Sequence, residues 1–159
     1  MASLLLLNGP NLNLLGERER ALYGGADLKS IEDAVVRLAT ELGHELETWQ
    51  SNAEHRLIER IHAAAGNVDC LLFNPGGFTH TSVALRDALL AAGLPFVEIH
   101  LSNIAARESF RRRSFFTDIA LGHISGFGAL SYELALRAAV CWLDEQAAVE
   151  GAATESGHQ

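Results

Sequence analysis

The sequence is most informative at Asn74-Pro75-Gly76-Gly77-Phe78-Thr79-His80-Thr81-Ser82. The apolar run before this stretch, 70–73, has the length of a buried strand, and the leucines and alanines after it favour a helix. A simple connection between a strand and a helix needs only about two to six residues. This one contains an amide, two glycines, three hydroxyls and an imidazole. Polar groups crowded at the carboxyl end of a central strand indicate a small-molecule site in an open α/β sheet.

Strand-like and helix-like segments alternate along the rest of the chain. The expected strands are 4–7, 44–49, 68–73, 96–100 and one between 114 and 124, and the expected helices are 28–42, 54–65, 83–92 and 130–145. This alternation predicts a parallel sheet that is covered by helices on both faces. Five strands in 159 residues favour a flavodoxin-like fold, which is a three-layer, doubly wound α/β sheet with strand order 2-1-3-4-5. We expect one catalytic domain, residues 1–146, and a disordered tail, residues 147–159.

Several local signals predict where the helices begin and end. Asp27 can cap the first helix, and Gly43 can end it. Ser51 and Glu54 have the spacing of a capping box at the start of the second helix. The segment from Asn11 to Gly25 is glycine-rich and charged, so it is either a mobile lid over a site or an ordinary surface loop.

Composition excludes several classes of protein. The net charge of −8 disfavours general nucleic-acid binding, and no apolar run approaches the ~20 residues of a membrane span. The first residues lack the basic region of a signal peptide, and Cys70 and Cys141 both lie in apolar surroundings, so we expect buried free thiols in a reducing cytoplasm. The single lysine, Lys29, lies in the first turn of a predicted helix, which is unsuitable for imine chemistry.

Polar side chains also follow the first and fourth predicted strands, so three polar loops should converge on one edge of the sheet. Two histidines, His80 and His100, lie at strand ends, and Glu98 shares a strand face with His100. An arginine cluster, Arg107 with 111–113, follows and favours an anionic ligand. Two other functions remain open on residues alone. One is a zinc-dependent hydrolase using His80, Glu98 and His100, and the other is a non-catalytic flavin-binding or receiver module.

Long motifs in the chain resemble those of the type II 3-dehydroquinate dehydratases. They include Asn8-Gly9-Pro10-Asn11-Leu12-Asn13-Leu14-Leu15-Gly16, Asn74-Pro75-Gly76-Gly77, Thr79-His80-Thr81-Ser82-Val83-Ala84-Leu85-Arg86-Asp87 and Glu98-Ile99-His100-Leu101-Ser102-Asn103. The likeness covers residues 4 to about 145, in order and with short gaps. It implies a lyase without cofactor or metal that converts 3-dehydroquinate to 3-dehydroshikimate by anti elimination of water through an enolate. The expected role is in the shikimate pathway of aromatic amino acid biosynthesis or in quinate breakdown.

The resemblance also implies catalytic roles for individual residues. Tyr23 would remove the proton from C2, and Arg18 would hold it as a phenolate. Asn11 would stabilise the enolate. His100, oriented by Glu98, would protonate the departing C1 hydroxyl.

The remaining implied residues bind substrate. The carboxylate would be held by Asn74, by Ser102 and by the backbone amides of Leu101 and Ser102, and the ring hydroxyls would be held by His80 and Arg111. Arg107 would add positive charge near the tyrosine. Asp87 would reach the site of a neighbouring subunit, because the family forms homododecamers of four trimers.

The chain departs from the usual family pattern at a few positions. Arg20 replaces a proline, Asp27 a threonine and His55 a glycine, and Gly76-Gly77-Phe78 is a less usual variant of its loop. None of these changes removes an expected catalytic group, so we expect an active enzyme.

Overall fold

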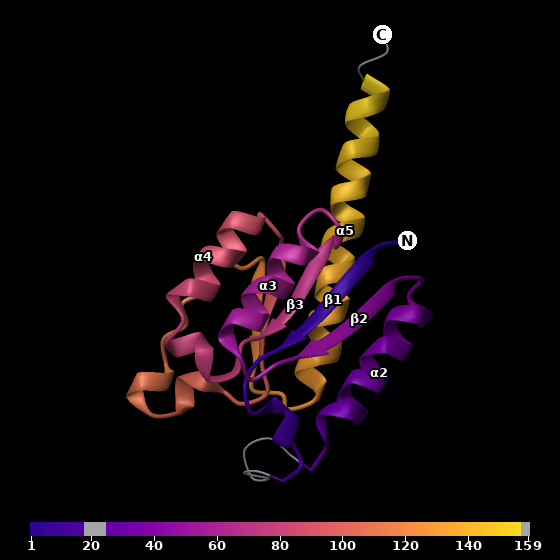
Figure 1. Ribbon diagram of the computed structural model, residues 1–159. Coiled ribbons are helices and arrows are strands. Elements are labelled where there is room, and N and C mark those ends of the chain that lie inside the picture. The colour runs from indigo at the N-terminus through magenta and orange to yellow at the C-terminus, as the bar shows by residue number, and fades with distance from the viewer. Residues whose placement is uncertain (18–24, 157–159) are drawn as a thin grey trace.

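The computed structural model describes residues 1–17 and 25–156. Five parallel strands form one sheet in the order β2-β1-β3-β4-β5, which confirms the predicted topology (Figure 1). The strands are β1 Ser3–Asn8, β2 Glu45–Gln50, β3 Cys70–Asn74, β4 Phe96–His100 and β5 Gly122–Ser125. The last strand occupies only the end of the range in which it was expected.

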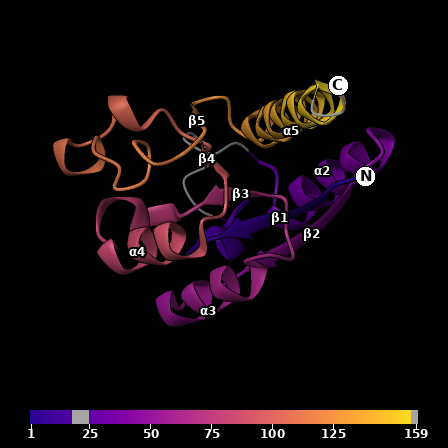
Figure 2. The same cartoon turned by 90° about the horizontal axis from the view of Figure 1, so that it is seen from above.

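Helices cover both faces of the sheet. They are α2 Leu28–Glu41, α3 Glu54–Ala64, α4 Val83–Ala92 and α5 Leu130–Ser156. Seen from above, α2 and α5 lie on one face, and α3 and α4 lie on the other (Figure 2). The three layers that the sequence predicted are therefore present. Among the described residues, no helix combines the length and apolar character needed to cross a membrane.

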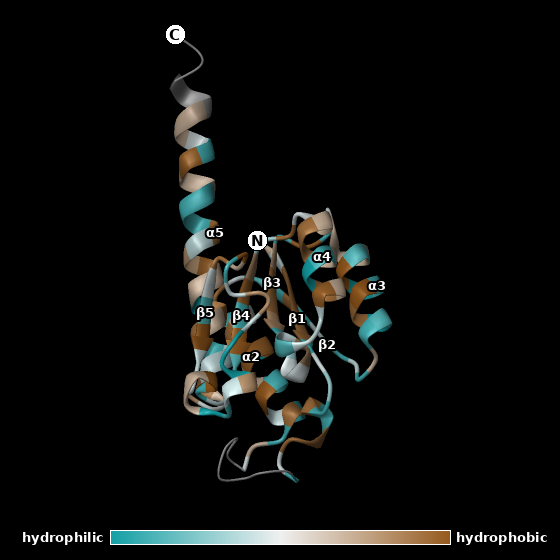
Figure 3. Cartoon of the chain, turned by 90° about the vertical axis from the view of Figure 1, so that its left-hand side faces the viewer, coloured by the Kyte–Doolittle hydropathy of each residue, from teal (hydrophilic) through white to brown (hydrophobic). Residues whose placement is uncertain are grey.

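The leucines of β1 are the centre of the core. Leu4 and Leu6 pack against the cluster beneath α2 and α5, whereas Leu5 and Leu7 pack against the cluster beneath α3 and α4. All four are at most 1% exposed. Burial of one leucine side chain stabilises a fold by about 1.5–3 kcal/mol, so this strand alone ties both layers to the sheet. The central strands are accordingly hydrophobic on both faces (Figure 3).

The first helix begins and ends as predicted, but the second does not. The Asp27 side chain accepts a hydrogen bond from the Ser30 amide at 2.8 Å, and Gly43 follows α2 with φ of 82°. At α3, Glu54 is the first helical residue rather than the third, so it cannot close a capping box with Ser51. Glu54 instead accepts a hydrogen bond from the Ser82 hydroxyl at the start of α4.

The C-terminal segment also differs from its prediction. The sequence placed the end of the last helix near Glu145 and a disordered tail over residues 147–159, but α5 continues to Ser156. Alanine, glutamate and glutamine dominate this extension, and it contains no proline, so its helix propensity is high. Its side chains from Asp144 to Ala153 are exposed, and the helix extends away from the sheet (Figure 1).

Only one of the two thiols is buried as predicted. Cys70 lies inside β3, where burial raises the pKa of its thiol to about 12. Cys141 is exposed, because it falls just outside the buried face of α5 that includes Ala139 and Val140.

Two glycines allow the loops after β1 and β3 to touch. A Cβ on Gly9 would lie 2.3 Å from the carbonyl oxygen of Pro75, and one on Gly76 would lie 2.9 Å from that of Pro10. Gly76 also has φ of 58°, a backbone conformation that residues other than glycine rarely adopt. The Gly9 amide donates to the Asn74 carbonyl at 2.8 Å. The two loops therefore hold each other at the edge of the sheet.

Gly9→Ala should destabilise the protein, because the new methyl group would collide with backbone that cannot move freely. We expect a loss of about 1–3 kcal/mol in the free energy of unfolding, measured by chemical or thermal denaturation. Gly77→Ala in the same loop is the matched control, since a methyl group there would meet nothing within 4 Å beyond its own chain neighbours. Equal stability of the two variants would contradict the close packing.

Candidate active site

A cavity of about 260 Å³ opens at the carboxyl edge of the sheet. It lies between the loops that follow β1, β3 and β4. Its lining residues are Pro10, Asn11, Leu12, Leu15, Asn74, Gly76, Gly77, His80, His100, Leu101, Ser102, Ile104, Arg107 and Arg111. The convergence of three polar loops that the sequence predicted is thus present, and eight of the expected site residues share this cavity.

The other four expected residues are placed differently. Glu98 is fully buried behind His100 and does not line the cavity. Asp87 is exposed on α4, also away from the lining. Arg18 and Tyr23 lie outside the residues that the structure describes.

The arginine cluster is divided by the fold. Only Arg107 and Arg111 line the cavity, and both lie near one carboxylate, that of Glu108, at 3.7 and 3.1 Å. The guanidinium of Arg113 instead stacks over an aromatic ring. Two guanidinium groups at the cavity wall suit an anionic ligand. Burial, together with the nearby positive groups, lowers the pKa of His80, whose Nδ1 lies 2.7 Å from the Arg113 carbonyl oxygen.

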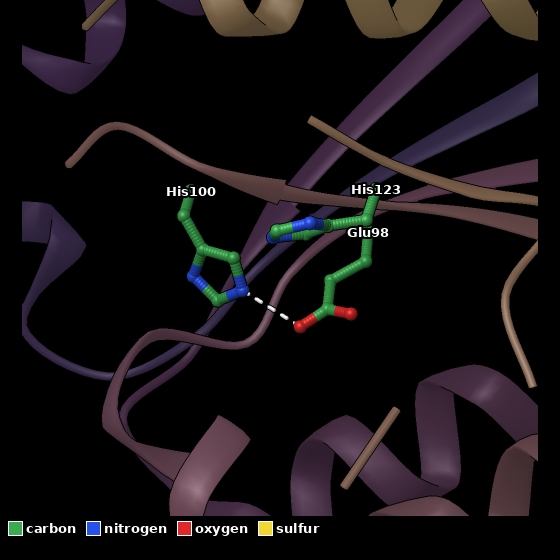
Figure 4. A group of neighbouring side chains, drawn as sticks. All are labelled: Glu98, His100 and His123. Carbon is green, nitrogen blue, oxygen red and sulfur yellow. Dashed lines mark hydrogen bonds and ion pairs between the residues drawn. The ribbon is translucent and has the colours of Figure 1, made fainter. Parts of the chain in front are cut away.

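Glu98 and His100 form a buried pair at the back of the cavity. Nε2 of His100 lies 2.7 Å from Oε1 of Glu98 (Figure 4). Burial alone would raise the pKa of Glu98, but hydrogen bonds from His100, Ser114 and Thr117 outweigh it and lower that pKa. An ionised carboxylate only accepts hydrogen bonds, so Nε2 carries a proton. Nδ1 is therefore the nitrogen of His100 that can exchange a proton with a ligand.

A second carboxylate, that of the half-buried Glu32, acts on Asn74 through two intermediaries. Asn8 donates from Nδ2 to Glu32 at 2.9 Å, and the Tyr132 hydroxyl donates to Oδ1 of Asn8 at 3.0 Å. Nδ2 of Asn74 then donates to the Tyr132 hydroxyl at 2.7 Å, while Oδ1 accepts from the Gly76 amide at 3.1 Å. The donors of this network all point toward Glu32, whose pKa partial burial raises and the hydrogen bond from Asn8 lowers.

This chain of hydrogen bonds fixes the orientation of the Asn74 amide. Its Oδ1 and one N–H are engaged, so the second N–H is available as a donor at the cavity wall. Tyr132 and Asn8 are fully buried, and burial raises the pKa of Tyr132 far above that of a free tyrosine. The tyrosine therefore remains a neutral hydroxyl that relays the hydrogen bond.

Sequence reasoning missed Asn8, Glu32 and Tyr132 as supports of the site. Tyr132 lies in a helix 58 residues after Asn74, so no local pattern connects the two. His123 was expected to be a surface or packing residue. It is exposed on β5, but its ring packs edge-on against His100 with centroids 5.6 Å apart. The contact arises because His123 on β5 is the register partner of Glu98 on β4. Predicting it would have required knowing the register of these two strands.

The three residues of the alternative zinc site, His80, Glu98 and His100, are not brought together as a group. In the described part of the chain, the group with suitable spacing is Glu98, His100 and His123, whereas His80 is not part of it. Lys29 is exposed and pairs with Asp33 at 2.9 Å, and this hydrogen bond raises its pKa. Imine chemistry needs a lysine with a lowered pKa, so the structure agrees with the exclusion of that mechanism.

The comparisons with known proteins identify the family. The family model for dehydroquinase class II matches residues 2–140. The chain belongs to the class II dehydroquinases. The 3-dehydroquinate dehydratase of Cellvibrio japonicus is 58% identical over 140 residues, covering 87% of this chain and 95% of the relative. That of Hahella chejuensis is 59% identical, with the same coverage.

Solved structures agree with this assignment to the class II dehydroquinases. The type II dehydroquinase of Butyrivibrio crossotus superimposes with a TM-score of 0.85 at 36% identity, covering 87% of this chain and 97% of that one. The enzyme of Propionibacterium acnes gives a TM-score of 0.83 at 38% identity, covering 90% and 96% of the two chains. The resemblance seen in the sequence is therefore confirmed at the level of the family.

Glu32→Lys tests the direction of the hydrogen-bond chain. A lysine donor at position 32 would require Asn8 to present its Oδ1 there and its N–H to Tyr132. The Tyr132 hydroxyl would then have to donate to Asn74, whose Oδ1 already accepts from the Gly76 amide. We expect Glu32→Lys to lower the free energy of unfolding by about 1–3 kcal/mol, the cost of one frustrated buried hydrogen bond. Glu32→Gln keeps an acceptor oxygen and should cost less than about 0.5 kcal/mol.

Denaturation of both variants measures this difference. Glu41→Lys, an exposed position near the end of the same helix, controls for the change of charge. If Glu41→Lys lowered the free energy of unfolding as much as Glu32→Lys, the proposed role of the hydrogen-bond network would be contradicted.

Proposed function

We propose that this protein is a 3-dehydroquinate dehydratase that works without a cofactor or a metal. The observation that carries the proposal is the Glu98–His100 pair at the back of a cavity with two arginines, in a chain of the dehydroquinase class II family. 3-Dehydroquinate carries a carboxylate, ring hydroxyls and a ketone, and these groups match the donors and cations around the cavity.

Substrate binding is assigned to three loops. The free N–H of Asn74, the Ser102 hydroxyl and the backbone amides of Leu101 and Ser102 bind the carboxylate. His80 and Arg111 hold ring hydroxyls, and Arg107 adds positive charge. Support comes from the fact that all these residues line one cavity.

The elimination uses one base and one acid on opposite sides of the substrate. Tyr23, held as a phenolate by Arg18, removes the proton from C2, and the electrons form an enolate at the C3 oxygen. Asn11 stabilises this oxyanion with a hydrogen bond, an arrangement that lowers the barrier because the dipole is already in place. The enolate then expels the C1 hydroxyl, which takes a proton from His100 and leaves as water. Glu98 balances the positive charge that His100 carries before this transfer.

Purified protein should convert 3-dehydroquinate to a conjugated enone that absorbs in the near ultraviolet. Neither EDTA nor borohydride should lower the rate, because neither a metal nor an imine takes part in the reaction. An absorbance assay with and without each reagent measures this. Lasting loss of activity in EDTA, or a borohydride-trapped adduct on Lys29, would overturn the mechanism.

Tyr23→Phe should reduce turnover by at least about 10²–10⁴-fold, the contribution of a positioned general base. Binding of a substrate analogue, measured by calorimetry, should be largely retained because only the phenolic oxygen is removed. Phe110→Tyr, a change of the same size at an exposed ring, is the matched control. Full activity in the Tyr23→Phe variant would show that Tyr23 is not the base.

We also propose a homododecamer of four trimers in the cytoplasm, with Asp87 reaching a neighbouring subunit's substrate. The exposed position of Asp87, outside the cavity of its own chain, supports this assignment. Sedimentation velocity should give a mass of about twelve chains. If the protein sediments as a monomer and is fully active, Asp87 has no role in catalysis.

A further inference from the structure

Glu98, His100 and His123 form a cluster that the proposed dehydratase reaction does not fully use. The Glu98 carboxylate and one ring nitrogen from each histidine lie within 4.8 Å of one another. Figure 4 shows the three side chains close together, with Glu98 and His100 from β4 and His123 from its neighbour β5. His123 has no part in the elimination, yet its ring contacts that of His100.

We propose that Glu98, His100 and His123 bind a divalent transition-metal ion, with Zn²⁺ as the physiological candidate, and that the bound ion inhibits the enzyme. Two imidazoles and one carboxylate are a common ligand set for zinc, with the fourth position left for water. The bound metal would coordinate Nε2 of His100 and so break the hydrogen bond to Glu98 that orients His100 for proton transfer. The inhibition therefore rests on the proposed function, whereas the metal binding does not.

The protonation states of the cluster suit metal binding. Glu98 is ionised, since its pKa is lowered by its hydrogen bonds despite its burial. Partial desolvation lowers the pKa of His123, while the nearby Glu98 carboxylate acts in the opposite direction. Metal ligands must be deprotonated, so the ion displaces the proton that Nε2 of His100 shares with Glu98, and this proton is released to solvent.

The geometry requires only small movements. Nε2 of His100 and Oε1 of Glu98 are 2.7 Å apart, and two metal bonds of ~2.0 Å at a tetrahedral angle need about 3.3 Å. The pair therefore has to open by roughly 0.6 Å to take an ion in place of the proton. His123 is exposed on the edge strand β5, so its side chain can turn toward the ion, and the ion can enter from that side.

Support around the cluster is already present. Ser114 donates to Oε1 of Glu98 at 2.6 Å, and Thr117 donates to Oε2. Ligating carboxylates are usually held by such partners, whose removal typically weakens metal binding about 10–100-fold. The carboxylate thus stays oriented after its bond to His100 is exchanged for a bond to the metal.

Cobalt binding tests the site without any assay of turnover. Co²⁺ added to the native oligomer should give the visible absorption bands of a four- or five-coordinate ion, and Zn²⁺ should bleach them. His123→Ala should weaken this binding by more than the ~10–100-fold expected for loss of a supporting residue. His62→Ala, which removes an exposed histidine from α3, should leave it unchanged. Identical bands in wild type and His123→Ala would overturn the site.

Turnover measurements test the inhibition separately. Zn²⁺ should slow the wild-type reaction, and EDTA should restore its rate. His123→Ala should need at least about tenfold more Zn²⁺ than wild type for the same fractional inhibition, each relative to its own metal-free rate. Equal inhibition of the two proteins would overturn the inhibitory role. Cobalt binding in a protein that does not dehydrate 3-dehydroquinate would refute the proposed function and leave the metal site standing.

Discussion

The absence of a polar face on β1 is the constraint on which the fold depends. Its four leucines are buried on both sides of the sheet, so helices must cover both faces. Only parallel strands joined by such helices allow this arrangement, and parallel strands end at the same edge. The polar loops after β1, β3 and β4 therefore meet, and the contacts of Gly9 and Gly76 lock two of them together.

Two carboxylates, the buried Glu98 and the half-buried Glu32, do not line the cavity but orient donors that do. Glu98 fixes the proton on one nitrogen of His100, and Glu32 fixes the Asn74 amide through Asn8 and Tyr132. An ionised carboxylate is an unconditional acceptor, so it gives each chain of hydrogen bonds one direction. Among the described residues, the cavity lining then contains neutral donors and arginines, which suits an anionic ligand.

Local charge matters more than net charge at this site. The chain carries −8 overall, yet Arg107 and Arg111 both line the cavity, and Glu108 lies near both. Charges separated by more than about 8 Å of solvent are largely screened at physiological ionic strength. The potential that a ligand experiences inside the cavity is therefore that of the two arginines and the polar loops.

The sequence by itself predicted the layers and the strand order, because burial on both faces and polar strand ends are local patterns, and its resemblance to the family supplied the eight expected site residues that line the cavity. It misjudged features that depend on what a helix packs against: the start of α3, the length of α5 and the exposure of Cys141. Only the tertiary structure decided that Tyr132 joins Asn8 to Asn74 and that His123 contacts His100. The physical reason is that these contacts join elements far apart in the chain, and their geometry follows from sheet register and helix rotation rather than from neighbouring residues.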